Sequence, residues 1–341
     1  MKVFVTGATG LIGSHSAAAL LAAGHEVVLY VRDAKKAREH FAMLGYEIGT
    51  IAVGDIRDKA RVLRAMTGCD AVLHAAAIVS LDPRKEREII ENNLHGTRAV
   101  IGTACEIGIK NIVYVSSLEV FDQKGRTSVD ETSPLGNSSI GYSKSKRQCE
   151  DYVRDLQRQR KPIQITYPAG VFGPDDPKLS EANRALTNLL GFVPRTTTGM
   201  QCVDARDIGL AHRWLIEHPA TEELQNARYI LGGRFYPWAD LHRSLEEATG
   251  KRVTSVNIPG GFLRFVGAMT DAMKSIVPFD TQISRDAMAI ATQWTPADSS
   301  RFTKRSGIEF RPGIETFTDT VRWMAQAGRI KPKLAGKLAQ N

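Results

Sequence analysis

Tyr142 and Lys146 stand four residues apart at the start of a predicted helix, so both side chains fall on one face of it. A free phenol has a pKa of about 10, which makes it a poor acid or base near neutral pH. A lysine ammonium close to the phenol favours the phenolate and brings the pKa into a useful range. Ser117 follows an apolar strand, where its hydroxyl can polarise a carbonyl oxygen while Tyr142 supplies the proton. These residues predict proton transfer to or from a carbonyl compound or an alcohol.

A glycine-rich turn connects the first predicted strand, residues 2–6, to a helix rich in small residues, 14–23. The glycines permit a tight turn and let the backbone approach a pyrophosphate, which the N-terminus of the helix also favours. The GxxGxxG spacing between a strand and a helix therefore indicates a dinucleotide site rather than a plain structural turn. We expect this site to contain Gly7, Thr9, Gly10, Leu11, Ile12 and Gly13.

The end of the second predicted strand bears on the choice of dinucleotide. A dinucleotide fold usually places an acid there to hold the ribose 2′-hydroxyl, but this chain has Val31 followed by Arg32. Arginine accommodates a 2′-phosphate, so Arg32 with Lys36 predicts NADP. The alternative is that Arg32 is a solvated loop charge and that Asp33 takes the role of the acid, which would favour NAD.

Two further strand ends carry residues that suit a bound dinucleotide. Asp55 and Ile56 close the third predicted strand, and Ala75, Ala76 and Ala77 follow the fourth. An acid at such an end can accept a hydrogen bond from the adenine amino group, and small residues leave room for the cofactor. We therefore include all five residues in the cofactor site.

The sequence resembles an extended short-chain dehydrogenase/reductase of the epimerase/dehydratase superfamily. The segments that carry this resemblance are residues 6–13, 93–97, 115–121, 142–146 and 168–174. The resemblance implies that Ser117 is the catalytic serine, because it stands three residues before Val120 in the Ser-x-x-Val-Tyr pattern of the family.

The resemblance also assigns roles outside the proton-transfer group. Asn93 matches the asparagine of Asn-x-x-Gly-Thr, and either shapes the site or a water relay, or is a structural amide within a helix. Pro168, Gly170 and Val171 are implied to contact the cofactor. Gly170 is also a departure, since sugar-nucleotide enzymes typically carry asparagine there to contact the substrate diphosphate. The segments Val31–Asp33 and Pro168–Val171 instead resemble the reductase branch, which includes enzymes similar to dihydroflavonol reductase and 3β-hydroxysteroid dehydrogenase.

The elements that must position these residues alternate between short β-branched runs and helical stretches, which predicts a doubly wound parallel sheet of the α/β Rossmann class. We expect residues 1–167 and 204–233 to form the dinucleotide-binding domain. Residues 168–203 and 234–330 should form a smaller, mostly helical substrate lobe, followed by a basic tail at 331–341.

Composition narrows the class of protein. The 341 residues carry a net charge of +8, and the apolar content of 43% is ordinary for a globular chain, which excludes disordered, collagen-like and coiled-coil proteins. The four cysteines lack the spacing of a metal or redox motif, so we expect reduced thiols and no metal. Neither a signal peptide nor a membrane span is predicted, so we expect a cytoplasmic protein. Family resemblance implies a homodimer through helices 86–106 and 143–160.

The favoured function is an NADP-dependent carbonyl reductase or alcohol dehydrogenase with Tyr142 as general acid/base. Its predicted substrate is a hydrophobic ketone or aldehyde, since the apolar stripe from Phe262 to Ile276 offers aromatic and Met surface beyond the part expected to pack the lobe. One alternative is a nucleotide-sugar epimerase or dehydratase that uses NAD. The other is a non-catalytic cofactor sensor or a nucleic-acid-binding protein; the charge of +8 is the only support for it, and we expect no nucleic acid partner.

Overall fold

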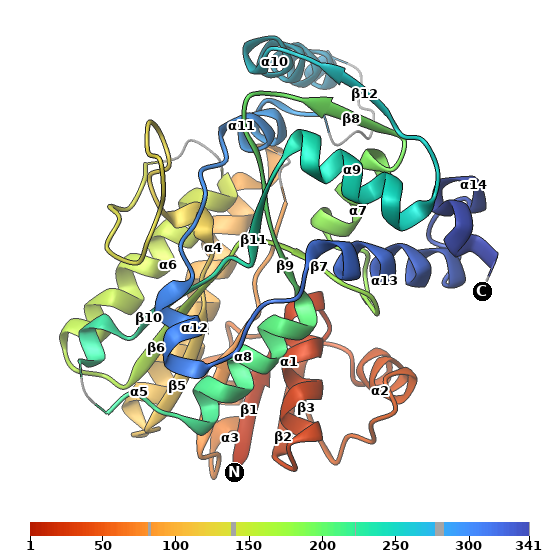
Figure 1. The fold of residues 1–341 in the computed structure, drawn as a ribbon. Helices are drawn as coiled ribbons and strands as arrows, with labels where there is room; N and C mark the ends of the chain where they lie inside the picture. The colour runs from red at the N-terminus through yellow and green to blue at the C-terminus, as the bar shows by residue number, and fades with distance from the viewer. Residues whose placement is uncertain (81–82, 138–140, 222, 277–282, 341) are drawn as a thin grey trace.

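The computed structural model describes residues 1–80, 83–137, 141–221, 223–276 and 283–340. Seven parallel strands form its main sheet (Figure 1). They are β1 (Lys2–Thr6), β2 (Glu26–Val31), β3 (Thr50–Val53), β4 (Ala71–His74), β5 (Asn111–Val115), β6 (Ile163–Pro168) and β10 (Arg228–Leu231). Their order is β10-β6-β5-β4-β1-β2-β3, and ligands of such sheets bind at the carboxyl ends of the strands where the order reverses, here β1 and β4.

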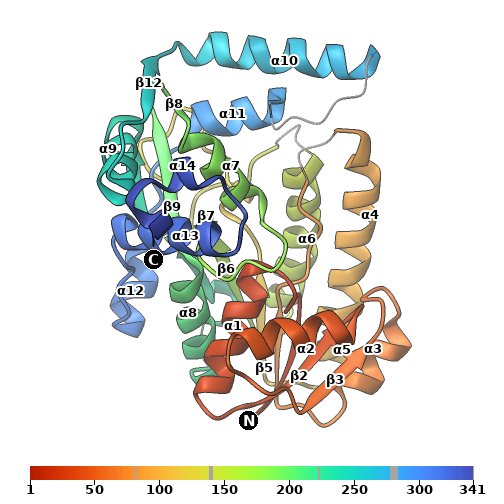
Figure 2. The ribbon, with the colours of Figure 1, turned by 90° about the vertical axis from the view of Figure 1, so that its right-hand side faces the viewer.

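Helices cover both faces of this sheet (Figure 2). One face carries α1 (Leu11–Ala22), α2 (Ala34–Met43), α8 (Ala205–Glu217) and α12 (Ser300–Ser306). The other carries α3 (Lys59–Met66), α4 (Glu86–Thr97), a π-helical turn (Arg98–Gly102), α5 (Thr103–Glu106) and α6 (Gly141–Arg158). Successive strand residues point to opposite faces, so Val3 and Val5 join one apolar cluster and Phe4 the other. The predicted Rossmann fold is confirmed.

A smaller lobe stands at the carboxyl edge of the sheet. Its strands are β7 (Gly170–Phe172), β8 (Phe192–Arg195), β9 (Gly199–Asp204), β11 (Arg234–Pro237) and β12 (Thr254–Asn257). Its helices are α7 (Glu181–Leu189), α9 (Trp238–Thr249), α10 (Gly260–Ile276), α11 (Arg285–Gln293), α13 (Gly313–Gln326) and α14 (Pro332–Ala335). Phe172, Trp238 and Phe317 lie in one buried cluster at its centre.

The last residues of the chain belong to this lobe. The sequence analysis predicted a basic tail at residues 331–341, but α14 and a 3-10 turn at Gly336–Gln340 occupy most of that segment. The lysines suggested an exposed tail, but Ala335 and Leu338, three residues apart, are both buried in the central cluster of the lobe. The division into two domains, as drawn from the sequence, stays a prediction.

More of the apolar stripe on helix α10 is exposed than expected. The apolar stripe was expected mostly to pack the lobe, yet Phe262, Phe265, Met269 and Met273 are all exposed. Polar groups of the helix point at α11 instead: the carboxylate of Asp271 accepts from the backbone N–H of Arg285, and Arg264 donates to Thr292. Helical spacing defines an apolar face but does not say which neighbour it meets, so the expectation of a packed stripe was wrong for these four side chains. No helix in the described part of the chain has the length and apolar character needed to cross a bilayer.

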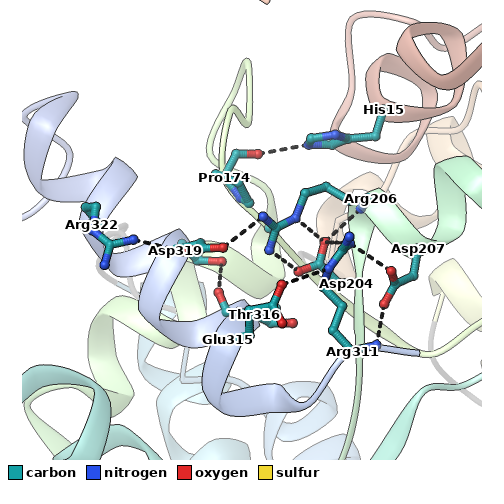
Figure 3. Close-up of polar contacts among 12 residues, drawn as sticks. His15, Pro174, Asp204, Arg206, Asp207, Arg311, Glu315, Thr316, Asp319 and Arg322 are labelled. Carbon is teal, nitrogen blue, oxygen red and sulfur yellow. Dashed lines mark hydrogen bonds and ion pairs between the residues drawn. The ribbon is translucent and has the colours of Figure 1, made fainter. Parts of the chain in front are cut away.

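A buried ionic network fastens α13 to the end of β9 and the start of α8 (Figure 3). Asp204 is fully buried and lies 2.8 Å from the Arg206 guanidinium, which also lies 2.8 Å from Asp319 of α13. Arg311, just before α13, is 2.7 Å from the carboxylate of Asp207 and donates its backbone N–H to the same group. The network therefore joins the lobe to the sheet through two buried carboxylates, those of Asp204 and Asp207.

Replacing Arg311 should expose how much the fold relies on this network. In Arg311→Met the buried Asp207 loses its ionic partner, and we expect the free energy of unfolding to fall by about 2–3 kcal/mol. Arg322→Met is the control, because Arg322 pairs with Asp319 at the surface and should cost less than about 1 kcal/mol. Urea titrations of both variants measure the difference; equal losses would contradict the assignment.

Candidate active site

The glycine turn between β1 and α1 has no space for side chains at two of its three glycines. A Cβ on Gly13 would lie 2.2 Å from the carbonyl oxygen of Gly7, and a Cβ on Gly7 would lie 2.6 Å from the backbone of Ala75. Gly7 also has a positive φ of 78°, which other residues adopt only with strain. Gly10 is the N-cap of α1 and offers no side-chain cap, so the first N–H groups of that helix remain for a ligand.

The other predicted cofactor residues gather at the same edge of the sheet. Ala75, Ala76 and Ala77 follow β4 directly and are half-buried, and Ala75 touches the glycine turn. Asp55 lies just beyond β3, where a bidentate contact with Arg57 lowers the pKa of its carboxyl to about 2. Thr9, Leu11 and Ile12 belong to the turn and the first turn of α1, and Ile56 packs against Gly96 of α4.

The proton-transfer residues meet at the carboxyl end of β5. Ser117 lies two residues after β5, and its hydroxyl hydrogen-bonds Tyr142 in the first turn of α6. Lys146, one turn further along α6, is buried and donates from Nζ to the carbonyl oxygen of Val115 at 2.9 Å. Its ammonium also lies 5.6 Å from the centre of the Tyr114 ring. The three residues selected from the sequence therefore form one group.

The charge states in this group differ from the sequence-based expectation. Burial raises the pKa of Tyr142, the hydrogen bond from Ser117 opposes that rise, and the carboxylate of Glu119 adds to it. Burial lowers the pKa of Lys146 to about 8. We expected Lys146 to lower the pKa of Tyr142, but burial of the phenol raises that pKa instead. In this state the phenol keeps its proton at neutral pH.

Glu119 is a site residue that sequence reasoning missed. It lies in the 3-10 turn Leu118–Val120 after Ser117, and burial raises the pKa of its carboxyl to about 7. Its charge acts on Tyr142, so the protonation of the two groups is linked. The signal was its place inside the serine motif, but nothing in the sequence showed that this acid would be removed from water.

Asn93 and the segment after β6 lie beside this group. The amide of Asn93 spans the chain after β4: it accepts from the Ile78 N–H at 2.7 Å and donates to the Ile78 carbonyl at 3.0 Å and to Ser145 at 2.9 Å. These bonds favour the structural interpretation of Asn93. Pro168 ends β6, Val171 is buried in β7, and a Cβ on Gly170 would lie 2.8 Å from the carbonyl oxygen of Gln201.

A cavity of about 510 Å³ opens beside the glycine turn. Arg32 and Lys36, selected from the sequence, line it, and so do Asp33 and Glu39. Lys178 lines it from the lobe. Sequence reasoning missed Lys178, because only the fold brings the turn after β7 next to α2.

Known proteins are similar to this chain in sequence and in fold. A sequence model of the NAD dependent epimerase/dehydratase family matches residues 3–231. The chain belongs to that family. The match confirms the resemblance noted in the sequence and makes the protein an NAD(P)-dependent enzyme of the extended short-chain dehydrogenase/reductase type.

Relatives in the family include both reductases and epimerases. The chain is 24% identical over 334 residues to a putative dihydroflavonol 4-reductase of Synechocystis sp., covering 96% of each. It is 25% identical over 340 residues to sterol demethylase protein B of Methylococcus capsulatus, covering 97% of this chain and 100% of that protein. The structure of a UDP-glucose 4-epimerase from Bifidobacterium longum in complex with NAD+ and UDP superposes with a TM-score of 0.74 at 20% identity, covering 96% of this chain and 99% of that one.

Closing the glycine turn should remove dinucleotide binding from this family member. In Gly13→Ala the added carbon meets the Gly7 carbonyl, so we expect binding of NAD(P)H to be lost and the free energy of unfolding to fall by about 1–3 kcal/mol. Gly49→Ala is the matched control, because a Cβ there meets nothing within 4 Å. Cofactor fluorescence and urea titration measure both effects. Tight binding by Gly13→Ala would show that the turn does not hold the dinucleotide.

Proposed function

We propose that the protein is an NADP-dependent carbonyl reductase that acts on hydrophobic ketones or aldehydes, or oxidises the corresponding alcohols. The observation that carries this proposal is the contact of Ser117 with Tyr142 at the end of β5, with Lys146 one turn along the same helix. A hydroxyl and a protonated phenol side by side suit a carbonyl oxygen, which accepts two hydrogen bonds and then a proton.

Each residue of the group has a separate task in this proposal. Tyr142 donates its proton to the oxygen of the substrate as the carbonyl becomes an alcohol, and takes a proton back in the reverse direction. Ser117 donates a hydrogen bond to the same oxygen and holds it in place. The raised pKa of Tyr142 keeps the phenol in the proton-donating form at neutral pH.

The dinucleotide-binding residues fit a nicotinamide cofactor. The closed glycine cradle and the uncapped start of α1 suit a pyrophosphate, with Gly10, Leu11 and Ile12 at that helix end. When bound, the nicotinamide supplies the hydride for reduction or accepts it in oxidation. Lys146 would hold the ribose next to that ring, while Asp55 and Ile56 would lie at the adenine.

Arg32 and Lys36 support the choice of NADP, because two cations line the cavity beyond the glycine turn. Asp33 is the N-cap of α2. Its carboxylate accepts a hydrogen bond from the Lys36 N–H and lies 3.6 Å from the Lys36 ammonium. An acid that already caps a helix is a poor candidate for the ribose hydroxyl. NAD, with Asp33 in that role, is the alternative.

The substrate class is inferred from the lack of space for a side chain at Gly170. At Gly170 even a Cβ would meet the backbone of Gln201, so no side chain can reach from there to a substrate diphosphate. This favours an uncharged carbonyl compound over a nucleotide sugar. The names of two full-length relatives, a putative dihydroflavonol reductase and a sterol demethylase protein, agree with lipophilic substrates. The homodimer through α4 and α6 and the cytoplasmic location stay predictions.

Removing one oxygen atom should separate chemistry from binding. We expect Tyr142→Phe to lower kcat by about 10²- to 10⁴-fold with unchanged cofactor affinity, because only the transferable proton is lost. Tyr152→Phe on the same helix is the control, since Tyr152 stacks under Arg98 away from Ser117. Steady-state assays use aromatic, steroidal and long-chain ketones, with UDP-sugars in parallel. Turnover confined to the UDP-sugars would replace the reductase proposal with the epimerase alternative.

The pH dependence of reduction should follow Lys146. Because burial lowers its pKa to about 8, the ammonium loses its proton above that pH, and kcat/KM should fall as it does so. Lys146→Arg keeps a positive charge at high pH and should flatten the profile, even at a lower overall rate. A wild-type profile that stays level to about pH 10 would contradict a role for the ammonium.

A further inference from the structure

A loop of the substrate lobe reaches across to the dinucleotide domain. The carbonyl oxygen of Pro174 lies 3.0 Å from Nε2 of His15 in α1 (Figure 3). Four residues later Lys178 lines the cavity that α2 borders on the other side. Thus the loop between β7 and α7 meets both helices that flank the predicted adenosine site.

This loop is held in one shape at a cost in backbone strain. Asp175 and Leu179, on either side of Lys178, both have φ of 55°, a left-handed conformation that is strained for a residue other than glycine. The buried carboxylate of Asp176 compensates by accepting three hydrogen bonds: from the Lys178 N–H, from the Ser180 N–H at 2.6 Å and from the side chain of Asn183 at 2.9 Å. The loop therefore fixes the backbone position from which the Lys178 side chain extends.

Lys178 stands among like charges. Burial and the charges of Arg32 and Lys36 lower its pKa, and only Asp176 acts in the other direction. Of the two acids that line the cavity, Asp33 caps α2 beside Lys36, and Glu39 lies 3.9 Å from Lys35. Three cations that converge from two parts of the chain repel one another unless an anion lies between them.

We propose that Lys178 completes an anion site with Arg32 and Lys36, and that this site takes the 2′-phosphate of the dinucleotide. The inference rests on the proposed use of NADP. A doubly charged phosphate offers several acceptor oxygens, which suits donors that approach from separate directions. Because Lys178 belongs to the lobe, the phosphate links the lobe to α2, so a lobe residue contributes to the selection of the cofactor.

The test uses fragments that differ only in this phosphate. Calorimetry measures binding of 2′,5′-ADP and of 5′-AMP to the wild-type protein, to Lys178→Ala and to Lys35→Ala. We expect Lys178→Ala to weaken 2′,5′-ADP binding about tenfold and to leave 5′-AMP binding unchanged. Lys35→Ala removes the same charge from an exposed position outside the cavity and should change neither affinity by more than about twofold.

The outcomes separate this inference from the proposed function. If the wild-type protein binds 2′,5′-ADP no more tightly than 5′-AMP, the proposed use of NADP fails and the inference with it. If the wild-type protein prefers 2′,5′-ADP and Lys178→Ala keeps that preference, NADP stands and only the role of Lys178 is overturned. If Lys178→Ala loses affinity for both fragments equally, Lys178 has a structural role in the loop and the inference is also overturned. Recovery of 2′,5′-ADP binding in Lys178→Arg would support the inference.

Discussion

The position of the active site depends on one buried carboxylate, Glu150. This side chain is fully buried and accepts from the hydroxyl of Ser116 at 2.7 Å, the hydroxyl of Tyr167 at 2.6 Å and the guanidinium of Arg154 at 2.6 Å. A charge without water must keep all its partners, since losing one costs several kcal/mol. Helix α6 is thereby fixed against β5 and β6 at once. Lys146 and Tyr142 lie one and two turns before Glu150, so the same contacts determine where they meet Ser117.

The site is also the place where the two parts of the molecule touch. The sheet provides the glycine turn, the strand ends and the proton-transfer group, whereas the lobe provides the segment after β6 and the strained loop that carries Lys178. Apolar contacts join both parts, since Val171 of β7 and Val203 of β9 belong to the same cluster as Val3 and Val5 of β1. Buried polar groups join them as well, through the ion pairs of Asp204 and Asp207. Such groups specify one relative position, because their bonds have direction.

Much of the fold and of the candidate site was predictable from the sequence, and the features that were not predicted have physical reasons. The strands of the main sheet are apolar runs that alternate with segments of helical periodicity, so their number and order along the chain could be predicted. The strands of the lobe were harder to predict, since β7 has three residues and pairs with residues of β9 that are 32 positions further along the chain. The exposure of four side chains of the α10 stripe and the raised pKa of Tyr142 depend on the surroundings of each group, which one sequence does not show. Lys178 was missed for the same reason: its neighbours are distant in the chain.

The ionic network at the end of β9 has a consequence for how the chain is made. Asp207 and its partner Arg311 are separated by 104 residues, and Asp319 lies later still. During synthesis β9 and α8 leave the ribosome long before Arg311 is added, so for that interval Asp207 lacks its guanidinium, whereas Asp204 already has Arg206 two residues away. We expect Asp207 to stay hydrated until Arg311 is available, because burying an unpaired carboxylate is costly. The sheet can assemble around its early strands in the meantime, but its join to the lobe is completed only when the C-terminal helices have been released.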